Sequence, residues 1–183
     1  MEQLKEALSA AGIAYKENEP LCAHCTFRIG GPADLFVLPE NEEQLCAAIR
    51  LAKEAGVRSY PLGNGSNILF EDAGYRGAVI NVSAMKSGIG VIENISFPGK
   101  DPALTYDAVV VGAGQMLSSL CMAALENSLT GLEFAYGIPG TVGGAVYMNA
   151  GAYGGEMKDV LVSVRYLTAE GETVEIPAEQ LDL

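Results

Sequence analysis

The stretch PLGNGSNILF, residues 61–70, places two glycines, two asparagines and a serine between two apolar segments, with no Lys or Arg among them. Glycine-rich backbone of this kind brings main-chain N–H groups close to a ligand or to another part of the chain. Two interpretations stay open at this point. The loop is either a nest of N–H groups that binds a diphosphate together with the Ser66 hydroxyl, or a tight turn that only needs positive φ at Gly63 and Gly65.

The residues before this loop predict a strand, a helix and a second strand. ADLFVLP (33–39) has the apolar, β-favouring composition of a strand. Asn41 is a helix N-cap, and Gln44 completes a capping-box pattern, so we expect a helix that ends near Ala55. The strand VRSYPL (57–62) then leads directly into the loop. We therefore expect the loop at the carboxyl end of a strand, where open sheets bind ligands.

The rest of the chain predicts an α+β fold, because strands and helices do not alternate regularly. The expected elements are a first helix within 1–12, turn-like structure at 17–25, strands at 77–83, 88–97 and 106–113 with the last two joined by 98–105, a helix at 116–128, a hairpin at 159–177 turning at Glu170 and Gly171, and a short helix from Pro177. The buried stripe expected for the helix at 116–128 is Leu117, Leu120, Cys121, Ala124 and Leu125.

Composition limits the possible partners and the location. The chain has 183 residues, 49% of them hydrophobic, and a formal net charge of −12, so we expect a folded protein that repels nucleic acid. No apolar stretch approaches the ~20 residues that span a bilayer, and the N-terminus lacks a signal-peptide pattern. We expect a cytoplasmic protein without a membrane partner, in which the thiols stay reduced, namely those of Cys22, Cys25, Cys46 and Cys121.

Two nucleotide-binding patterns are incomplete. The loop at 61–70 is not a Walker A loop, because no Gly-Lys-Ser/Thr follows it. Gly112 and Gly114 lie between a strand and a helix, as in a dinucleotide-binding fingerprint, but Leu117 stands where the third glycine is needed for close helix packing. A strand-to-helix corner is favoured there, with a Rossmann-type dehydrogenase as the alternative.

The cluster Cys22, His24 and Cys25 is typical of metal sites, but a closed zinc site needs four ligands and no second Cys/His pair follows. We therefore expect no metal. His24 is the chain's one histidine, and packing or a hydrogen bond is its expected role.

A second glycine-rich stretch is GIPGTVGGAVYMNAGAYGG, residues 137–155, with seven glycines in nineteen residues. Pro139 is expected at the start of a short helix, which would offer a second edge of exposed amides. An acidic protein with two such glycine-rich stretches is expected to bind a long nucleotide, with one stretch at each end of it. We therefore expect a cofactor cleft between lobes.

Three segments, in this order and spacing, resemble the MurB family, the UDP-N-acetylenolpyruvoylglucosamine reductases of bacterial cell-wall synthesis: HCTFRIGGPADLFVLP, PLGNGSNILF and GLEFAYGIPGTVGGAVYMNAGAYGGEMKDV. The similarity runs from about residue 20 to the end of the chain, and GTVGGAVYMNAGAYGGE resembles the second, shorter type of the family. The resemblance implies a two-lobed FAD-binding domain of the vanillyl-alcohol-oxidase/PCMH type. Its expected parts are an N-terminal helix (1–19), lobe 1 (20–85) and lobe 2 (86–183).

The resemblance also implies the cofactors and the reaction. FAD is bound without a covalent bond, NADPH reduces it, and the flavin passes hydride to the enolpyruvyl double bond of the UDP-sugar, giving UDP-N-acetylmuramate. The first loop would hold the FAD pyrophosphate, and the second stretch would contact the isoalloxazine and the adenosine. The implied FAD-binding residues are Gly63, Asn64, Gly65, Ser66, Asn67, Gly137, Ile138, Pro139, Gly140, Thr141, Gly143, Gly144, Asn149, Gly151, Ala152 and Tyr153.

In the family, a segment with a catalytic Arg follows, and then a substrate domain with the proton-donating Ser and a Glu; all three residues are expected beyond Leu183. We therefore expect this chain to be a truncated reductase that cannot complete the reaction. The alternative is a flavin- or nucleotide-binding module without catalysis. Oligomeric state and the preferred nicotinamide donor do not follow from the sequence.

Several single residues carry narrower expectations. Arg28 either contacts a phosphate or pairs with Asp34, and the pairing is favoured. Tyr153 is expected to contact the cofactor. Glu156 and Asp159 are expected to be solvated or to cap a helix, because neither has an acid or base partner.

Overall fold

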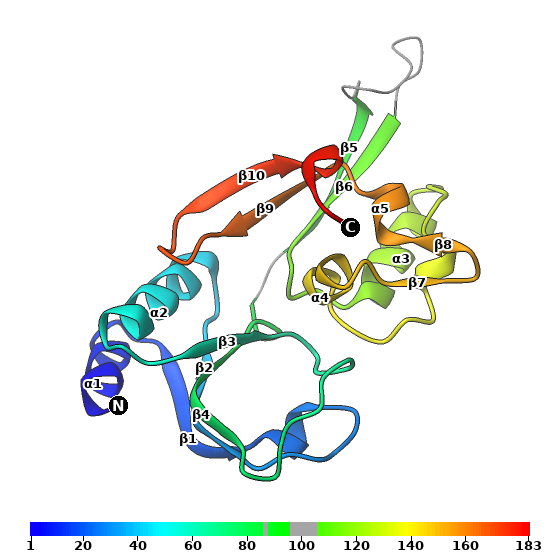
Figure 1. The fold of residues 1–183 in the computed structure, drawn as a ribbon. Helices are drawn as coiled ribbons and strands as arrows, with labels where there is room; N and C mark the ends of the chain where they lie inside the picture. The colour runs from blue at the N-terminus through cyan, green and yellow to red at the C-terminus, as the bar shows by residue number, and fades with distance from the viewer. Residues whose placement is uncertain (86–87, 96–105) are drawn as a thin grey trace. The chain divides into compact units, whose positions relative to one another are not determined.

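The structure is a computed structural model, and it describes residues 1–85, 88–95 and 106–183 (Figure 1). The chain forms two compact units: Met1–Lys86 with Arg165–Val174, and Ser87–Val164 with Glu175–Leu183. The predicted strand 88–97 lies partly outside the described residues, and the predicted connection 98–105 lies wholly outside them.

The helices are α1 (Glu2–Ala10), α2 (Glu42–Glu54), α3 (Leu117–Glu126), α4 (Val142–Tyr147) and α5 (Met157–Val160), with 3₁₀ helices η1 (Leu21–His24), η2 (Glu133–Ala135) and η3 (Ala178–Gln180). The strands are β1 (Ala14–Pro20), β2 (Pro32–Leu38), β3 (Ser59–Leu62), β4 (Tyr75–Asn81), β5 (Ile89–Ile95), β6 (Tyr106–Val111), β7 (Gly151–Ala152), β8 (Gly155–Glu156), β9 (Ser163–Leu167) and β10 (Thr173–Pro177). Within the described part of the chain, no helix has the length and apolar character needed to cross a bilayer.

The first unit is built on a four-stranded sheet in the order β1-β2-β4-β3. β4 pairs in parallel with both β2 and β3, whereas β1 pairs antiparallel with β2. The predicted strand, helix and strand are β2, α2 and β3, and the crossover through α2 leaves room for β4 between the two strands. The carboxyl ends of β3 and β4 therefore meet at one edge of the sheet.

Alternate side chains of this sheet enter two separate cores. On one face, Leu35, Val37, Ala78 and Ile80 pack with the apolar sides of α1 and α2, including Leu4, Leu8, Ala48 and Ala52. On the other face, Phe36 and Val79 pack with Leu21, Leu62 and Phe70. Residues 63–70 belong to this second face, since Gly65 lies against His24 and Phe70 packs near Leu21.

α2 begins as predicted at Asn41, whose Oδ1 accepts a hydrogen bond from Gln44 N at 2.9 Å. The reciprocal bond differs from the expected capping box. Gln44 Oε1 accepts from the main-chain N–H of Glu40, one residue before the cap, at 2.9 Å. Leu45, Ala48, Ile49 and Ala52 lie on the side of α2 that packs on the core.

The turn-like structure expected at 17–25 is wrong for residues 17–20, which lie in a strand. β1 covers Ala14–Pro20, and only then does η1 begin. The sequence AYKENEP is polar and mostly exposed, so its strand conformation depends on the hydrogen-bond ladder to β2 rather than on apolar alternation.

The second unit contains an antiparallel pair β5-β6, followed by α3 and the glycine-rich stretch. Leu117, Leu120, Cys121 and Ala124 are buried on α3 as predicted, but Leu125 is 68% exposed, so its predicted burial is wrong. β9 and β10 form the predicted hairpin, with Gly171 in its turn at a φ of 79°. The predicted short helix after Pro177 is η3.

Two exposed ion pairs explain why the hairpin turn, residues 165–174, belongs to the first unit. Lys53 Nζ lies 2.7 Å from Glu170 Oε1, and Arg165 Nη2 lies 2.6 Å from Glu42 Oε2. Both pairs connect α2 with the hairpin. The mixture of separate helices and small sheets is the expected α+β fold.

Candidate functional site

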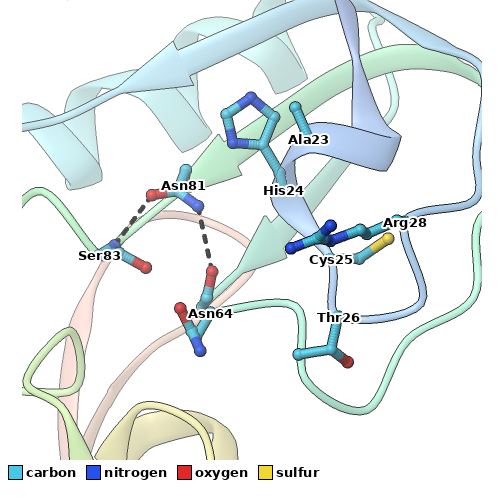
Figure 2. Close-up of a pocket in the computed structure, with 9 residues that line it drawn as sticks. Ala23, His24, Cys25, Thr26, Arg28, Asn64, Asn81 and Ser83 are labelled. Carbon is cyan, nitrogen blue, oxygen red and sulfur yellow. Dashed lines mark hydrogen bonds between the residues drawn. The ribbon is translucent and has the colours of Figure 1, made fainter.

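The first unit contains a hollow of about 490 Å³ on the sheet face that does not carry α1 and α2 (Figure 2). Three segments contribute to it: η1 with the loop that follows, the loop after β3, and the end of β4. The residues that line it are Ala23, His24, Cys25, Thr26, Arg28, Gly63, Asn64, Asn81 and Ser83.

Strand register explains why Asn81 faces this hollow. Ala78 and Ile80 of β4 point to the helices, so Val79 and Asn81 point to the opposite face. Asn81 is a buried polar residue with 8% of its surface exposed. Its Nδ2 donates to Gly63 O and its Oδ1 accepts from Ser83 N, each at 3.1 Å (Figure 2). The side chain therefore fixes the start of the 63–67 loop to the end of β4.

The middle of the loop is fixed against η1. Gly65 has a φ of 64°, and a Cβ at this position would lie 2.0 Å from the carbonyl oxygen of His24. Thr26 holds the same part of the loop, because its N–H donates to Gly65 O at 3.1 Å and its hydroxyl donates to Ser66 O at 3.2 Å. Among the two loop glycines, only Gly65 has the positive φ that the turn interpretation required.

The loop keeps main-chain donors available. The N–H groups of Asn64, Gly65 and Asn67 donate to no residue in the described ranges. Gly65 is itself buried, and buried N–H groups almost always have an acceptor. Free amides this close together along the chain suit a phosphate group, so the residues present fit the diphosphate of a flavin nucleotide. Of the five predicted loop residues, Gly63 and Asn64 line the hollow.

His24 is held by packing and a hydrogen bond, as expected. Its ring stacks on Phe36 with centroids 4.1 Å apart, and its Nε2 lies 2.8 Å from Glu19 Oε1. Hydrogen bonds from Lys16 and then from His24 lower the pKa of Glu19. Within the residues that the structure describes, no three His, Cys, Asp or Glu side chains are close enough to hold a metal ion.

The favoured pairing of Arg28 with Asp34 is wrong. Asp34 Oδ1 lies 2.7 Å from Nη1 of Arg76, and Asp34 Oδ2 accepts from the main-chain N–H of Gly77 at 2.9 Å. Arg76 extends from β4, the neighbour of β2 in the sheet, which explains why it reaches Asp34. Arg28 instead lines the hollow.

The glycine-rich stretch of the second unit is built by close packing. Thr141, and not Pro139, precedes the short helix α4, so the expected helix start at Pro139 is wrong. Thr141 is 1% exposed, and its Oγ1 accepts from Gly144 N at 3.4 Å. A Cβ at Gly143 would lie 2.7 Å from Ala113 Cβ. Part of the glycine content therefore serves helix packing.

A β7-β8 hairpin follows, with a hollow of about 350 Å³ along Gly151–Glu156. Tyr153 lies at its turn, 97% exposed and with a φ of 53°. Asn149 holds the hairpin to α5, because its Nδ2 donates to Glu156 Oε2 at 2.7 Å and its Oδ1 accepts from Lys158 N at 3.0 Å. Glu156 and Asp159 form a capping box on α5, which confirms their predicted capping role.

The corner at Gly112 and Gly114 is not a dinucleotide-binding fingerprint. The preceding strand β6 pairs antiparallel with β5, whereas the fingerprint belongs to a parallel βαβ unit. Leu117 is fully buried at the start of α3 and its N–H donates to Gly140 O at 2.9 Å.

Sequence reasoning missed most of the residues that line the first hollow. It named Gly63 and Asn64 as binding residues, and it gave a phosphate contact of Arg28 only as the less favoured alternative. Asn81 could have been found from the alternation along β4, once the face of Val79 was known. Ala23, Thr26 and Ser83 carried no signal of their own in the sequence.

Comparisons with known proteins identify the family of this chain. The family model described as "FAD binding domain" matches residues 33–177. The UDP-N-acetylenolpyruvoylglucosamine reductase of Agathobacter rectalis is 43% identical over 185 aligned positions, which cover 100% of this chain and 57% of that protein. The chain therefore spans little more than half the length of this relative.

Solved structures show the same fold. The crystal structure of UDP-N-acetylenolpyruvylglucosamine reductase (MurB) from Thermus caldophilus matches with a TM-score of 0.65 at 30% identity, covering 93% of this chain and 54% of that one. A VAO-type flavoprotein of Myceliophthora thermophila matches with a TM-score of 0.62 at 18% identity, covering 78% and 26% of the two chains. The latter likeness concerns the fold alone and confirms the expected fold type. The chain thus belongs to the FAD binding domain family, and its relatives within that family are the MurB reductases.

Proposed function

We propose that this chain is the FAD-binding portion of a UDP-N-acetylenolpyruvoylglucosamine reductase, and that residues 63–67 bind the FAD diphosphate. The free main-chain N–H groups of Asn64, Gly65 and Asn67 carry this proposal. The electrostatics of the hollow support it. Although the chain has a net charge of −12, none of the nine residues that line the hollow is Asp or Glu. An anionic ligand therefore meets amide dipoles without a facing carboxylate.

Each residue group has a separate task in this proposal. The amides of Gly63, Asn64, Gly65, Ser66 and Asn67 orient the diphosphate, and Asn81 keeps their loop in place. The second stretch contacts the rest of FAD through its main chain and through Tyr153, whose ring is exposed. The proposed residues there are Gly137, Ile138, Pro139, Gly140, Thr141, Gly143, Gly144, Asn149, Gly151, Ala152 and Tyr153.

The reaction of the whole protein is part of the proposal. FAD, when bound, supplies the hydride-transfer chemistry, and the chain binds and positions it. The names of the relatives point to a UDP-sugar as the substrate, and NADPH is the proposed electron donor. We further propose a cytoplasmic location without a nucleic-acid partner, supported by the net charge of −12 and by four cysteines without disulfides.

FAD binding by the purified chain is the first test. After incubation with FAD and removal of the excess, we expect a flavin absorbance spectrum with two peaks. Acid precipitation should leave the yellow colour in the supernatant, because the flavin is not attached covalently. A chain that returns colourless from gel filtration, with unchanged FAD fluorescence on titration, would refute the proposed cofactor.

A second measurement separates an FAD-binding portion from a complete enzyme. The chain with bound FAD is supplied with NADPH and the UDP-enolpyruvyl sugar, and NADPH oxidation is compared with that by a full-length relative. We expect the relative to turn over and this chain not to. Sugar-dependent turnover by the chain alone would show that it holds the catalytic groups as well.

A further inference from the structure

Among the described residues that line the hollow of the first unit, one has a permanently charged side chain, and it is Arg28. Figure 2 shows its guanidinium extending into the hollow, on the side of Asn64 and Asn81. The loop at 63–67 has no cation of its own, so Arg28 brings a positive charge to it from a different part of the chain. Asn64, one of the loop residues with a free amide, lines the same hollow.

The charge of Arg28 has no partner within the described ranges. Its guanidinium has no carboxylate within ion-pair distance there, and Asp34, the acceptor expected from the sequence, is paired with Arg76. Most of the other described cations are paired, although Arg50 also makes no ion pair and Arg58 lies over the Tyr75 ring. Six of the described ones form ion pairs, namely Lys5, Lys16, Lys53, Arg76, Lys158 and Arg165. In a chain with a net charge of −12, an arginine in a hollow without a facing carboxylate is available for an anionic ligand.

The backbone of Arg28 is fixed in an unusual conformation. Its φ is 55°, a left-handed value that residues other than glycine rarely adopt. Its N–H donates to Cys25 O at 3.2 Å, and the Cys25 thiol donates to Ile29 O at 3.3 Å, so the turn is closed on both sides. Such outliers gather at ligand-binding sites when the surrounding structure holds them.

We infer that Arg28 binds the diphosphate of FAD directly and supplies the cationic contact that the 63–67 loop lacks. This inference rests on the proposed function. The amides of the loop contribute partial charges, and the planar guanidinium adds a full charge that can donate two parallel hydrogen bonds to phosphate oxygens. Lysine at this position would keep the charge and lose the paired geometry.

The test compares three variants of the 183-residue chain by flavin fluorescence titration. Arg28→Gln removes the charge but leaves a non-glycine residue at the left-handed position. Arg28→Lys keeps the charge. Arg50→Gln makes the same charge change on the exposed side of α2, away from the hollow, and is the matched control. Urea unfolding of each chain without FAD measures stability separately.

Arg28→Gln should weaken FAD binding about tenfold, Arg28→Lys should recover part of this loss, and Arg50→Gln should stay close to the unsubstituted chain. The affinity of the unsubstituted chain should also fall more steeply with salt than that of Arg28→Gln. All three variants should unfold at similar urea concentrations.

Equal FAD affinity of Arg28→Gln and Arg50→Gln would overturn the role of Arg28 while leaving the proposed cofactor intact. A loss that Arg28→Lys does not recover, together with lower stability in urea, would mean that Arg28 supports the fold instead. Failure of the unsubstituted chain to bind FAD would overturn the proposed function, and this inference with it.

Discussion

Gly65 illustrates how a single missing side chain shapes the site. Its φ is 64°, and the carbonyl oxygen of His24 occupies the space where a Cβ would stand, at 2.0 Å. Gly56 has the same φ of 64°, but no atom lies within 4 Å of the place where its Cβ would stand. A side chain at either position would therefore strain the backbone. Only at Gly65 would it also collide with a neighbouring atom.

Gly65→Ala should destabilise the chain by at least about 2 kcal/mol more than Gly56→Ala, since the clash adds to the strain. It should also weaken FAD binding, because the loop must move. Urea unfolding and FAD titration of both variants measure these effects. Similar unfolding midpoints for the two would show that the contact between Gly65 and His24 is not tight in solution.

Asn81 is the buried side chain that holds the loop. Asn81→Ala leaves Gly63 O and Ser83 N without their partner, so we expect a loss of about 1–3 kcal/mol in the free energy of unfolding and weaker FAD binding. Asn127→Ala is the control, because it removes an exposed bond from Asn127 Nδ2 to Ala123 O. Equal effects of the two substitutions on FAD affinity would contradict the positioning role of Asn81.

Glu19 makes the stability of the first unit depend on pH. Hydrogen bonds from Lys16 and His24 lower its pKa below the ordinary 4.5, so the folded chain favours the charged carboxylate. This contribution is complete above the ordinary pKa and is lost as the pH falls through the lowered value.

Glu19→Gln should therefore be less stable than the unsubstituted chain at pH 7, and the difference should shrink once the pH falls below about 4.5. Glu179→Gln, at an exposed position of η3, is the control. Urea unfolding at several pH values measures the difference. A constant gap between Glu19→Gln and the unsubstituted chain at all pH values would exclude this electrostatic origin.

Local sequence signals were sufficient for some residues of the site and not for others. The glycines and asparagines at 63–67 stand out because a turn needs them within a few residues. Asn81 and Arg28 lie far from this loop in sequence and reach it through strand order and a left-handed turn. Arg76, rather than Arg28, pairs with Asp34 because β4 lies beside β2, and sequence spacing does not reveal that neighbour.

Among the elements, α2 was the most predictable. Its N-cap at Asn41 and its end near Ala55 are local features that were confirmed, although Gln44 bonds to Glu40 N and not to Asn41 N as a capping box requires. β1 is the opposite case, because its polar residues become a strand only through pairing with β2. Leu125 was expected to be buried because helical spacing places it beside the apolar face of α3. In the structure the buried face of this helix is narrower and leaves Leu125 exposed.

The cap of α2 can be tested by itself. Asn41→Ala removes the acceptor for Gln44 N, so we expect the free energy of unfolding to fall by about 1 kcal/mol. Asn41→Ser keeps an oxygen acceptor, so it should lower the free energy of unfolding by only a few tenths of a kcal/mol. Thermal unfolding followed by circular dichroism compares them. An alanine variant as stable as the serine variant would show that this bond does not stabilise the helix.

For the molecule as a whole, the fold type was predictable because long motifs, not single glycines, carried the resemblance. The matching FAD binding domain family covers 33–177, which includes both glycine-rich stretches. Charge acts at the same scale. A net charge of −12 disfavours binding of anions in general, so the hollow without lining carboxylates marks a place where one anion is favoured.

The central claim is that main-chain amides of residues 63–67 hold the FAD diphosphate, and a crystal structure of the chain with FAD tests it most directly. We predict phosphate oxygens about 2.7–3.2 Å from the main-chain nitrogens of Asn64, Gly65 or Asn67. A bound flavin whose diphosphate lies elsewhere, with these three nitrogens still without a ligand, would contradict the account.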